Sequence, residues 1–190
     1  LLDSPLKGTN MARSKENFSG STSLEGKYGM FAMKLMEREL KNFTPDFVAR
    51  KSVACFGNRI ICLGSGISNS NVNCPTETTL FQCALPAKYQ PVVLEDSCTL
   101  KDPFGNYFYI QKGKPHQTEG LQHSFHNKSR KATEGKFLTA WIDHGKAPQN
   151  AEYEYLILLR PTEKERKKAR QSYIIKQQDC QAHIVFDKLT

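Results

Sequence analysis

One short stretch of the sequence holds three side chains suited to acid–base chemistry. Glu25, Lys27 and Tyr28 place a carboxylate, an ammonium and a phenol within four residues. Glutamate and tyrosine both serve as general acids or bases in enzymes. Adjacent residues of an extended chain point to opposite faces, so the three side chains need not converge. We therefore favour a non-catalytic role for them.

A second group combines an indole, a carboxylate and an imidazole. Trp141, Asp143 and His144 lie together and are followed by a glycine. Such a set at the end of a strand could bind a sugar or exchange a proton. No second base or nucleophile is evident nearby in the sequence. We therefore favour a turn at the strand end, with Trp141 in the core.

Two further motifs suggest ligand binding but lack the residues that it needs. His116, His123 and His126 share a polar, basic stretch, yet a metal site requires further ligands in fixed geometry. We interpret them as solvated side chains. Gly64–Ser65–Gly66 could begin a phosphate loop, but no Gly-Lys-Ser/Thr follows it and no helical pattern comes after it. We interpret it as a turn between strands and predict neither a metal nor a cofactor.

The cysteines give no sign of a metal or redox motif. None of them is paired at C-x-x-C spacing, which removes support for a structural zinc or a thioredoxin-type site. Cys55 and Cys62 sit inside apolar runs and are expected to be small buried residues. Cys74, Cys83 and Cys98 lie nearer to turns and could form disulfides, although spacing alone does not settle the pairing. The six cysteines are Cys55, Cys62, Cys74, Cys83, Cys98 and Cys180.

The net charge of the chain is +8, from 27 Lys and Arg against 19 Asp and Glu. This balance favours an anionic partner, such as nucleic acid, anionic lipid or a sulfated or carboxylated polysaccharide, over a neutral one. A basic but otherwise ordinary soluble surface explains the charge equally well. The basic runs Arg130-Lys131 and Lys164 to Arg170 lack interleaved aromatic residues, so we predict no nucleic-acid platform. Glu163 and Glu165 alternate with bases in the second run, which favours a solvated helical face.

The apolar runs and the first ten residues indicate whether the chain carries a transmembrane helix or a signal peptide. No run of about 18 apolar residues exists, so we predict no transmembrane helix. Residues 1–10 have no initiator methionine, no basic region and no long apolar segment. We therefore expect no signal peptide here and interpret the start as the middle of a longer chain.

The elements that must position these side chains are predicted to be mostly strands. A Gly57–Asn58 turn between apolar, β-branched runs predicts a hairpin. The stretch 28–40 fits either a helix or a strand. Thr162-x-x-Glu165 has the form of a capping box and predicts one short helix over 163–170. Strands are expected at 47–56, 59–63, 76–84, 107–110, 137–143, 153–159 and 183–186, with loops at 1–27, 64–73 and 111–136.

Six to nine short strands and a single helix favour a mainly β fold, an antiparallel β-sandwich or part of one. Four blocks of sequence stand out together: 18–20 with 23–30, 77–82, 133–135 with 140–144 and 153–155, and 183–189. In this order and spacing they resemble the chondroitin sulfate ABC lyases of polysaccharide lyase family 8. The resemblance is weakest from Cys83 to Lys131, where this chain is shorter and off-pattern.

The lyases that this chain resembles are large secreted or periplasmic bacterial enzymes. In these, a helical toroid precedes a central antiparallel β-supersandwich, which is galactose-mutarotase-like. They cleave glycosaminoglycans by β-elimination, which needs a neutralised uronate carboxylate, a base for the C5 proton and an acid for the leaving oxygen. On this basis residues 1–27 are a loop-rich lead-in and residues 28–190 a segment of the supersandwich. The expected partners are chondroitin or dermatan sulfate and the helical domain of the same chain, and the expected location is extracellular or periplasmic.

The family uses a His, a Tyr, an Arg and a Glu for this elimination. By the resemblance, the first three belong to the toroid and the Glu to a Glu-Asn-x-x-Gly motif before Leu1. Glu16-Asn17-x-x-Gly20 has the same form but aligns later in the family sequence, so we assign no catalytic residue to this chain. Two alternatives remain open at this point. One is a free-standing basic carbohydrate-binding module, and the other is a small complete enzyme that uses Glu25, Tyr28 or His144.

Overall fold

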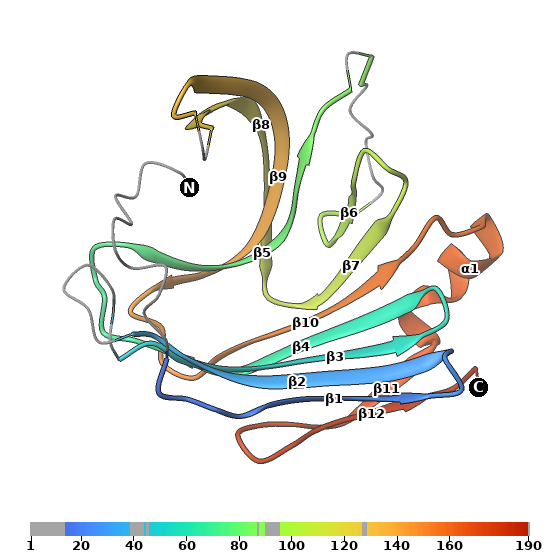
Figure 1. Cartoon of the computed structure of the whole chain (residues 1–190). Helices are drawn as coiled ribbons and strands as arrows, with labels where there is room; N and C mark the ends of the chain where they lie inside the picture. Colours follow the sequence, from blue (N-terminus) through green and yellow to red (C-terminus); the bar gives the residue numbers. More distant parts are fainter. Residues whose placement is uncertain are drawn as a thin grey trace.

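The structure, a computed structural model, describes residues 14–38, 44, 46–86, 88–89, 96–126 and 129–189. These residues form three antiparallel sheets and one short α-helix, arranged in layers (Figure 1). A seven-stranded sheet lies in the middle, with a three-stranded sheet on one side and a two-stranded ribbon on the other. The prediction of a mainly β, antiparallel sandwich with one short helix is confirmed.

The seven-stranded sheet has the order β1-β2-β3-β4-β10-β7-β6, and the three-stranded sheet has the order β5-β9-β8. The ribbon consists of β11 and β12. The helix is followed directly by a single 3₁₀ turn, Ala169–Gln171. The bounds are β1 Ser19–Leu24, β2 Tyr28–Met36, β3 Val48–Phe56, β4 Arg59–Ser68, β5 Pro75–Ala84, β6 Thr99–Lys101, β7 Tyr107–Lys112, β8 Lys114–Phe125, β9 Ala132–Lys146, β10 Ala151–Leu158, α1 Glu163–Lys168, β11 Tyr173–Gln178 and β12 His183–Asp187.

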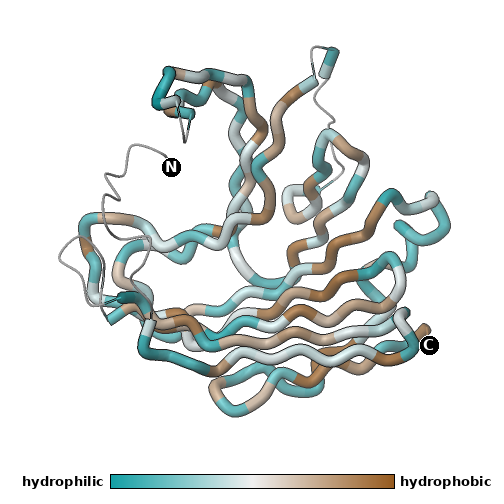
Figure 2. Tube along the Cα trace, viewed as in Figure 1, coloured by the Kyte–Doolittle hydropathy of each residue, from teal (hydrophilic) through white to brown (hydrophobic). Residues whose placement is uncertain are grey.

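The inner face of the seven-stranded sheet, which packs on β5 and β9, is apolar. Alternate residues of each strand point to the same side, so one strand supplies both faces. Buried side chains of this core come from both sheets, and Ile142 and Ala140 of β9 are fully enclosed. Phe81 of β5 packs on Phe108 of β7, with ring centroids 4.9 Å apart. Figure 2 shows the hydrophobic stretches concentrated on the central strands, while the far end of the β8–β9 hairpin is hydrophilic.

The outer face of the same sheet meets the ribbon and the helical segment. Its core is smaller and contains Ile61, Leu63, Leu156 and Leu158 from the sheet, covered by Tyr173 at the start of the ribbon and by Ala169. A buried ion pair joins Arg59 of β4 to Asp187 of β12 and ties the two layers together. The outer layer is therefore joined to the sheet by both apolar and polar contacts.

Several predicted elements are confirmed. β3 and β4 form the expected hairpin around Gly57, which has a φ of +61°. Residues 28–36 are a strand, which resolves the helix-or-strand ambiguity. In α1 the side chains of Thr162 and Glu165 form the reciprocal capping box, which satisfies two backbone donors at the helix start.

Three loop predictions are wrong in part. Ser19–Leu24, inside the predicted lead-in 1–27, is β1, and its six exposed residues carry no hydrophobic alternation that would reveal a strand. The predicted turn at 64–66 lies inside β4, which continues to Ser68. The predicted loop 111–136 contains β8 and the start of β9, an exposed hairpin arm whose polar faces give no strand signal. β6 and β11 were not predicted.

Candidate functional site

The structure places Glu25, Lys27 and Tyr28 at the turn between β1 and β2. Glu25 and Gly26 both have positive φ, +53° and +65°, which makes a tight turn. Glu25 is exposed, and the ring of Tyr28 packs toward Phe56 with centroids 6.2 Å apart. This stretch functions as a hairpin turn in the described structure.

His144 lies near the end of β9, in contact with two neighbouring strands. Its Nε2 is 2.8 Å from Oγ1 of Thr78, and its ring centroid is 6.1 Å from that of Tyr153. Burial lowers the pKa of His144 below its ordinary value, and Asp143 only partly opposes that effect. The neutral imidazole is thus favoured at neutral pH. Trp141 is not in the buried core as expected, because it is only partly buried and stacks on the ring of His116, 5.6 Å away.

The strand registers separate His144 from the Glu25–Tyr28 turn. Tyr153, beside His144, is level with Gly64, Lys51 and Met33 across four strands. Tyr28 lies five residues further along β2, which is roughly 17 Å at the spacing of an extended chain. Glu25, Tyr28 and His144 therefore do not converge on one site in the described structure.

The three histidines of the predicted basic loop spread along the β8–β9 arm. His116 and His123 are seven residues apart on β8, roughly 23 Å in an extended strand. His123 lies 3.6 Å from a carboxylate oxygen of Glu134, and Nδ1 of His126 accepts hydrogen bonds from Ser129. Within the described ranges, no three His, Cys, Asp or Glu side chains gather as a metal site would need.

The cysteines and the two basic runs singled out in the sequence lie in surroundings that are common in folded proteins. All six cysteines are free thiols, and burial raises the pKa of Cys62 to about 11. Arg130 lies over the ring of Phe125 at the far end of the arm. Arg166 of α1 is bonded to Glu163, which matches the predicted solvated helical face. No helix in the described part of the chain is long and apolar enough to cross a membrane.

Gly64, Ser65 and Gly66 have structural roles that their sequence did not reveal. A Cβ on Gly64 would lie 2.1 Å from Cε1 of Tyr153, so the bare backbone makes room for that ring. Gly66 has a φ of +60°, and a Cβ there would lie 2.8 Å from a terminal nitrogen of Arg50. The two glycines therefore let an aromatic ring approach one face of β4 and a guanidinium the other.

Ser65 belongs to a hydrogen-bond chain that joins the sheet to the ribbon. The Ser65 hydroxyl donates to the carbonyl of Asp179 at 2.9 Å, so its oxygen must accept from Nε2–H of His183, 2.8 Å away. Nδ1 of that neutral ring then accepts from the hydroxyl of Ser52 at 2.7 Å. Burial lowers the pKa of His183, Asp179 opposes the shift, and nearby Arg50 adds to it. The network thus fixes one tautomer of a neutral histidine.

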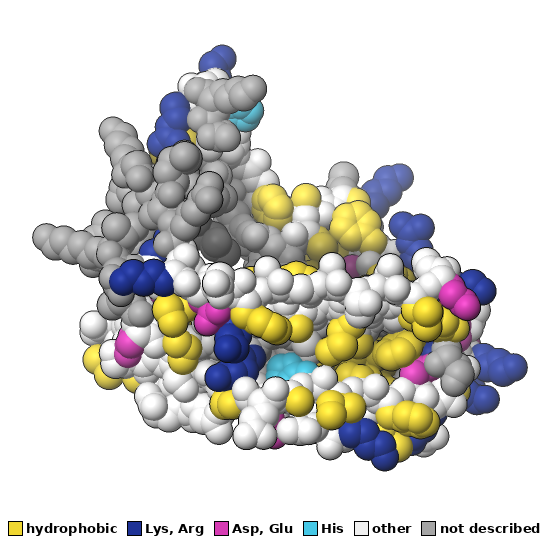
Figure 3. Space-filling view, turned by 60° about the horizontal axis from the view of Figure 1, so that its bottom comes forward, with side chains coloured by type: hydrophobic (Ala, Val, Ile, Leu, Met, Phe, Trp, Pro, Cys, Tyr) yellow, Lys and Arg dark blue, Asp and Glu magenta, His cyan; other side chains and the backbone are white. Residues whose placement is uncertain are grey.

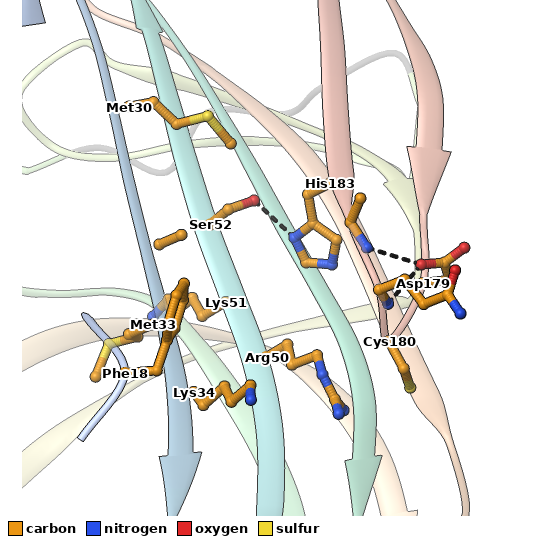
Figure 4. Close-up of a pocket in the computed structure, with 13 residues that line it drawn as sticks. Phe18, Met30, Met33, Lys34, Arg50, Lys51, Ser52, Asp179, Cys180 and His183 are labelled. Atoms are coloured by element: carbon orange, nitrogen blue, oxygen red, sulfur yellow. Dashed lines mark hydrogen bonds between the residues drawn. The ribbon is translucent and has the colours of Figure 1, made fainter. Parts of the chain in front are cut away.

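A pocket of about 450 Å³ opens beside this histidine, between β2, β3 and the turn of the ribbon. Figure 4 shows His183 and Ser52 at its centre, with Lys34 and Arg50 extending side by side from neighbouring strands. Sequence reasoning assigned no role to Lys34, Arg50, Ser52 or His183. His183 and Ser52 are 131 residues apart, so only the folded register brings them together.

Comparison with known proteins gives the family. Residues 2–170 match the model of the polysaccharide lyase family 8 super-sandwich domain. The chain belongs to polysaccharide lyase family 8. Two relatives from Proteus vulgaris are a chondroitin sulfate ABC endolyase, 37% identical over all of this chain, and a chondroitin sulfate ABC exolyase, 40% identical over 95% of it. The chain spans 21% and 19% of their lengths, respectively.

Solved structures agree with this family 8 fold. A chondroitin AC lyase of Streptomyces coelicolor A3 superposes with a TM-score of 0.74 at 18% identity, over 89% of this chain and 23% of that one. A Paenibacillus xanthan lyase gives a TM-score of 0.73 at 22% identity, over 92% and 19% of the two chains. These likenesses support the super-sandwich architecture, and the chain corresponds to about a fifth of each of these solved chains.

Proposed function

We propose that this chain is the super-sandwich segment of a glycosaminoglycan lyase that cleaves chondroitin or dermatan sulfate by β-elimination. The single observation that carries the proposal is the whole-length match to chondroitin sulfate ABC lyases, at 37% identity, by a chain that spans only 21% of the relative. The net charge of +8 supports a polyanionic substrate.

We further propose that the groups that perform the elimination lie outside these residues. The reaction needs a base at the C5 proton, a proton donor for the leaving oxygen and a cation against the uronate carboxylate. The acid–base candidates Glu25 and Tyr28 lie at one end of the seven-stranded sheet, whereas His144 of β9 lies beside Tyr153, which is level with a position five residues further along β2. That separation supports a scaffold that works with a helical domain elsewhere in the parent protein.

A lyase assay on two proteins tests this proposal. The 190-residue chain, shown by circular dichroism to be folded, is incubated with chondroitin sulfate, and the unsaturated uronate product is followed by ultraviolet absorbance. We expect no product from this chain and product from the longer parent protein that contains it. Product from the isolated chain that disappears on Glu25→Gln or His144→Ala would place the active site inside it and overturn the scaffold role.

An extracellular or periplasmic location is part of the same proposal, since a long anionic polysaccharide does not cross a membrane unaided. Fractionation of the native cells with an antibody to this chain tests it. We expect the signal in the medium or the periplasm. A cytoplasmic signal alone would contradict the location while leaving the lyase assay unaffected.

A further inference from the structure

The pocket between the ribbon turn and strands β2 and β3 has the size of a ligand site. Its volume, about 450 Å³, lies within the roughly 300–1,000 Å³ of small-molecule sites. In the space-filling view, Lys and Arg side chains lie beside a histidine in a hollow of this face (Figure 3). The lining residues are Phe18, Met30, Ala32, Met33, Lys34, Arg50, Lys51, Ser52 and 179–183.

Two cations share one wall of this pocket. Lys34 of β2 and Arg50 of β3 are directly paired in the register, so their side chains lie on the same face. No ion pair in the described structure involves either of them. Nε of Arg50 is buried and has no hydrogen-bond partner. A buried guanidinium donor without an acceptor is unfavourable, and neither Arg50 nor Lys34 has a carboxylate within ion-pair distance among the described residues to balance its charge.

The acids near these cations are already bound to backbone donors. Glu16 accepts from the backbone N–H groups of Asn17 and Phe18, and these bonds, with Lys34 and Arg50 nearby, lower its pKa. Asp179 accepts from the backbone of the ribbon turn and from a glutamine side chain. Asp179 lines the pocket, whereas Glu16 does not, and neither carboxylate is within ion-pair distance of Lys34 or Arg50 among the described residues.

Beside these cations the pocket is apolar and aromatic (Figure 4). Phe18 is 52% exposed, and the ammonium of Lys34 lies 5.6 Å from the centroid of its ring. Met30 and Met33 continue the apolar surface. An exposed ring beside two cations suits a sugar, because the carbon-bound hydrogens of a sugar pack on an aromatic face while its acidic substituent meets the cations.

The cationic wall is held in place by the backbone. Gly66, with a φ of +60°, leaves the space that a terminal nitrogen of Arg50 occupies. His183 is fixed by both ring nitrogens between Ser52 and Ser65. A site that is organised before binding loses less entropy when the ligand arrives.

From these contacts we propose that the pocket binds an oxyanion-bearing sugar, with Arg50 and Lys34 holding a sulfate ester or carboxylate and Phe18 stacking on the ring. The site is a binding site on the outer face of the sheet and takes no part in the elimination. It gives this segment an affinity of its own. Only the identity of the polymer, chondroitin sulfate, rests on the proposed function; the oxyanion site rests on the side chains described above.

Isothermal titration calorimetry on the folded 190-residue chain tests this. The probes are a sulfated chondroitin tetrasaccharide, a neutral tetrasaccharide of the same length and inorganic sulfate. We expect Arg50→Gln to weaken binding of the sulfated probe at least tenfold and Lys34→Gln, at an exposed position, about threefold to tenfold. Lys131→Gln on the distant β8–β9 arm removes the same charge and should leave affinity unchanged within twofold.

Three results would overturn the proposal. One is equal affinity for the neutral probe, and another is unchanged binding by both Arg50→Gln and Lys34→Gln. The third is inorganic sulfate binding as tightly as the tetrasaccharide, which would reduce the site to a bare-ion site. Failure of the lyase assay on the parent protein leaves these binding results untouched, so the two proposals fail separately.

Discussion

The two faces of the seven-stranded sheet are closed by different means. The inner face meets β5 and β9 through apolar side chains, with Ile142 and Ala140 fully enclosed. The outer face has an apolar core of its own and is also joined to the ribbon by a buried ion pair and by a hydrogen-bonded histidine, beside a pocket. Apolar contact has no preferred direction, whereas each polar link needs one geometry. Both faces therefore draw stability from apolar packing, and the outer face adds polar links of fixed geometry and a pocket beside them.

The largest expected effect is on the free energy of unfolding when a buried side chain of the inner face is shortened. Ile142→Ala removes a side chain with no exposed area and leaves a cavity. We expect the free energy of unfolding in urea to fall by about 4 kcal/mol. Leu121→Ala on β8, where the side chain is 57% exposed, is the control and should stay near the wild-type value. Equal losses for the two variants would show that the inner face is loosely packed.

On the outer face the largest effect is expected at the buried ion pair. Asp187→Asn leaves the guanidinium of Arg59, whose residue is only 8% exposed, without its counter-charge. We expect a loss of about 3 kcal/mol, because an unpaired buried charge costs more than the pair contributes. Hydrogen exchange should rise in β11 and β12 before it rises in β10.

An exposed ion pair provides the matched control for this variant. Glu163→Gln removes the partner of Arg166 on the surface of α1, and exposed pairs contribute little. We expect an unfolding curve that superposes on the wild type. If hydrogen exchange in the Asp187→Asn variant rose equally in all three sheets, the ribbon would not open independently of the inner layer, and the prediction would be wrong.

Gly64→Ala tests the contact between β4 and an inner-face ring. The added Cβ would lie 2.1 Å from Cε1 of Tyr153, so the ring or the strand must move. We expect a loss of about 2 kcal/mol, typical of overpacking, measured by urea unfolding. Gly20→Ala in β1 adds a Cβ that meets nothing within 4 Å and should be neutral. A neutral Gly64→Ala would mean that Tyr153 is not held in this position.

The smallest expected effect is a pH dependence of the outer face. The pKa of His183 is lowered in the folded chain, mainly by burial, so the unfolded chain binds a proton more readily. Stability is therefore highest above the unfolded pKa of about 6.5 and falls as the pH drops through the lower folded value. His183→Asn should remove this part of the pH dependence of ribbon exchange. His144 titrates in the same direction from the inner face, and its contribution should persist in that variant.

Much of this fold could be predicted from sequence because local chemistry and tertiary structure agree. The β3–β4 turn, the capping box of α1 and the apolar runs of β9 and β10 each carry a signal in their own residues. β1 and β8 carry none, because an exposed strand has no apolar face to alternate. The turn prediction at Gly64–Ser65–Gly66 was wrong for another reason. These glycines look like a turn but serve close approach within a strand.

The outer-face site was beyond the reach of sequence patterns. Lys34 and Arg50 meet only through the pairing of β2 with β3, and His183 reaches Ser52 across 131 residues. A register of this kind depends on which strands become neighbours, and no local motif encodes it. The family resemblance located the block around His183 but assigned no role to it.

The hydrogen bonds of His183 also specify how the ribbon lies on the sheet. In β12 the inward residues are His183, Val185 and Asp187, while Ile184 and Phe186 face solvent with 47% and 53% of their surface exposed. A slip of one residue would exchange these two sets, and hydrophobicity alone would favour the slipped arrangement. The hydrogen bonds of His183 and the ion pair of Asp187 can form in only one register of β12 on the sheet. The sequence thus gives up some apolar burial, and the position of the ribbon is fixed in return.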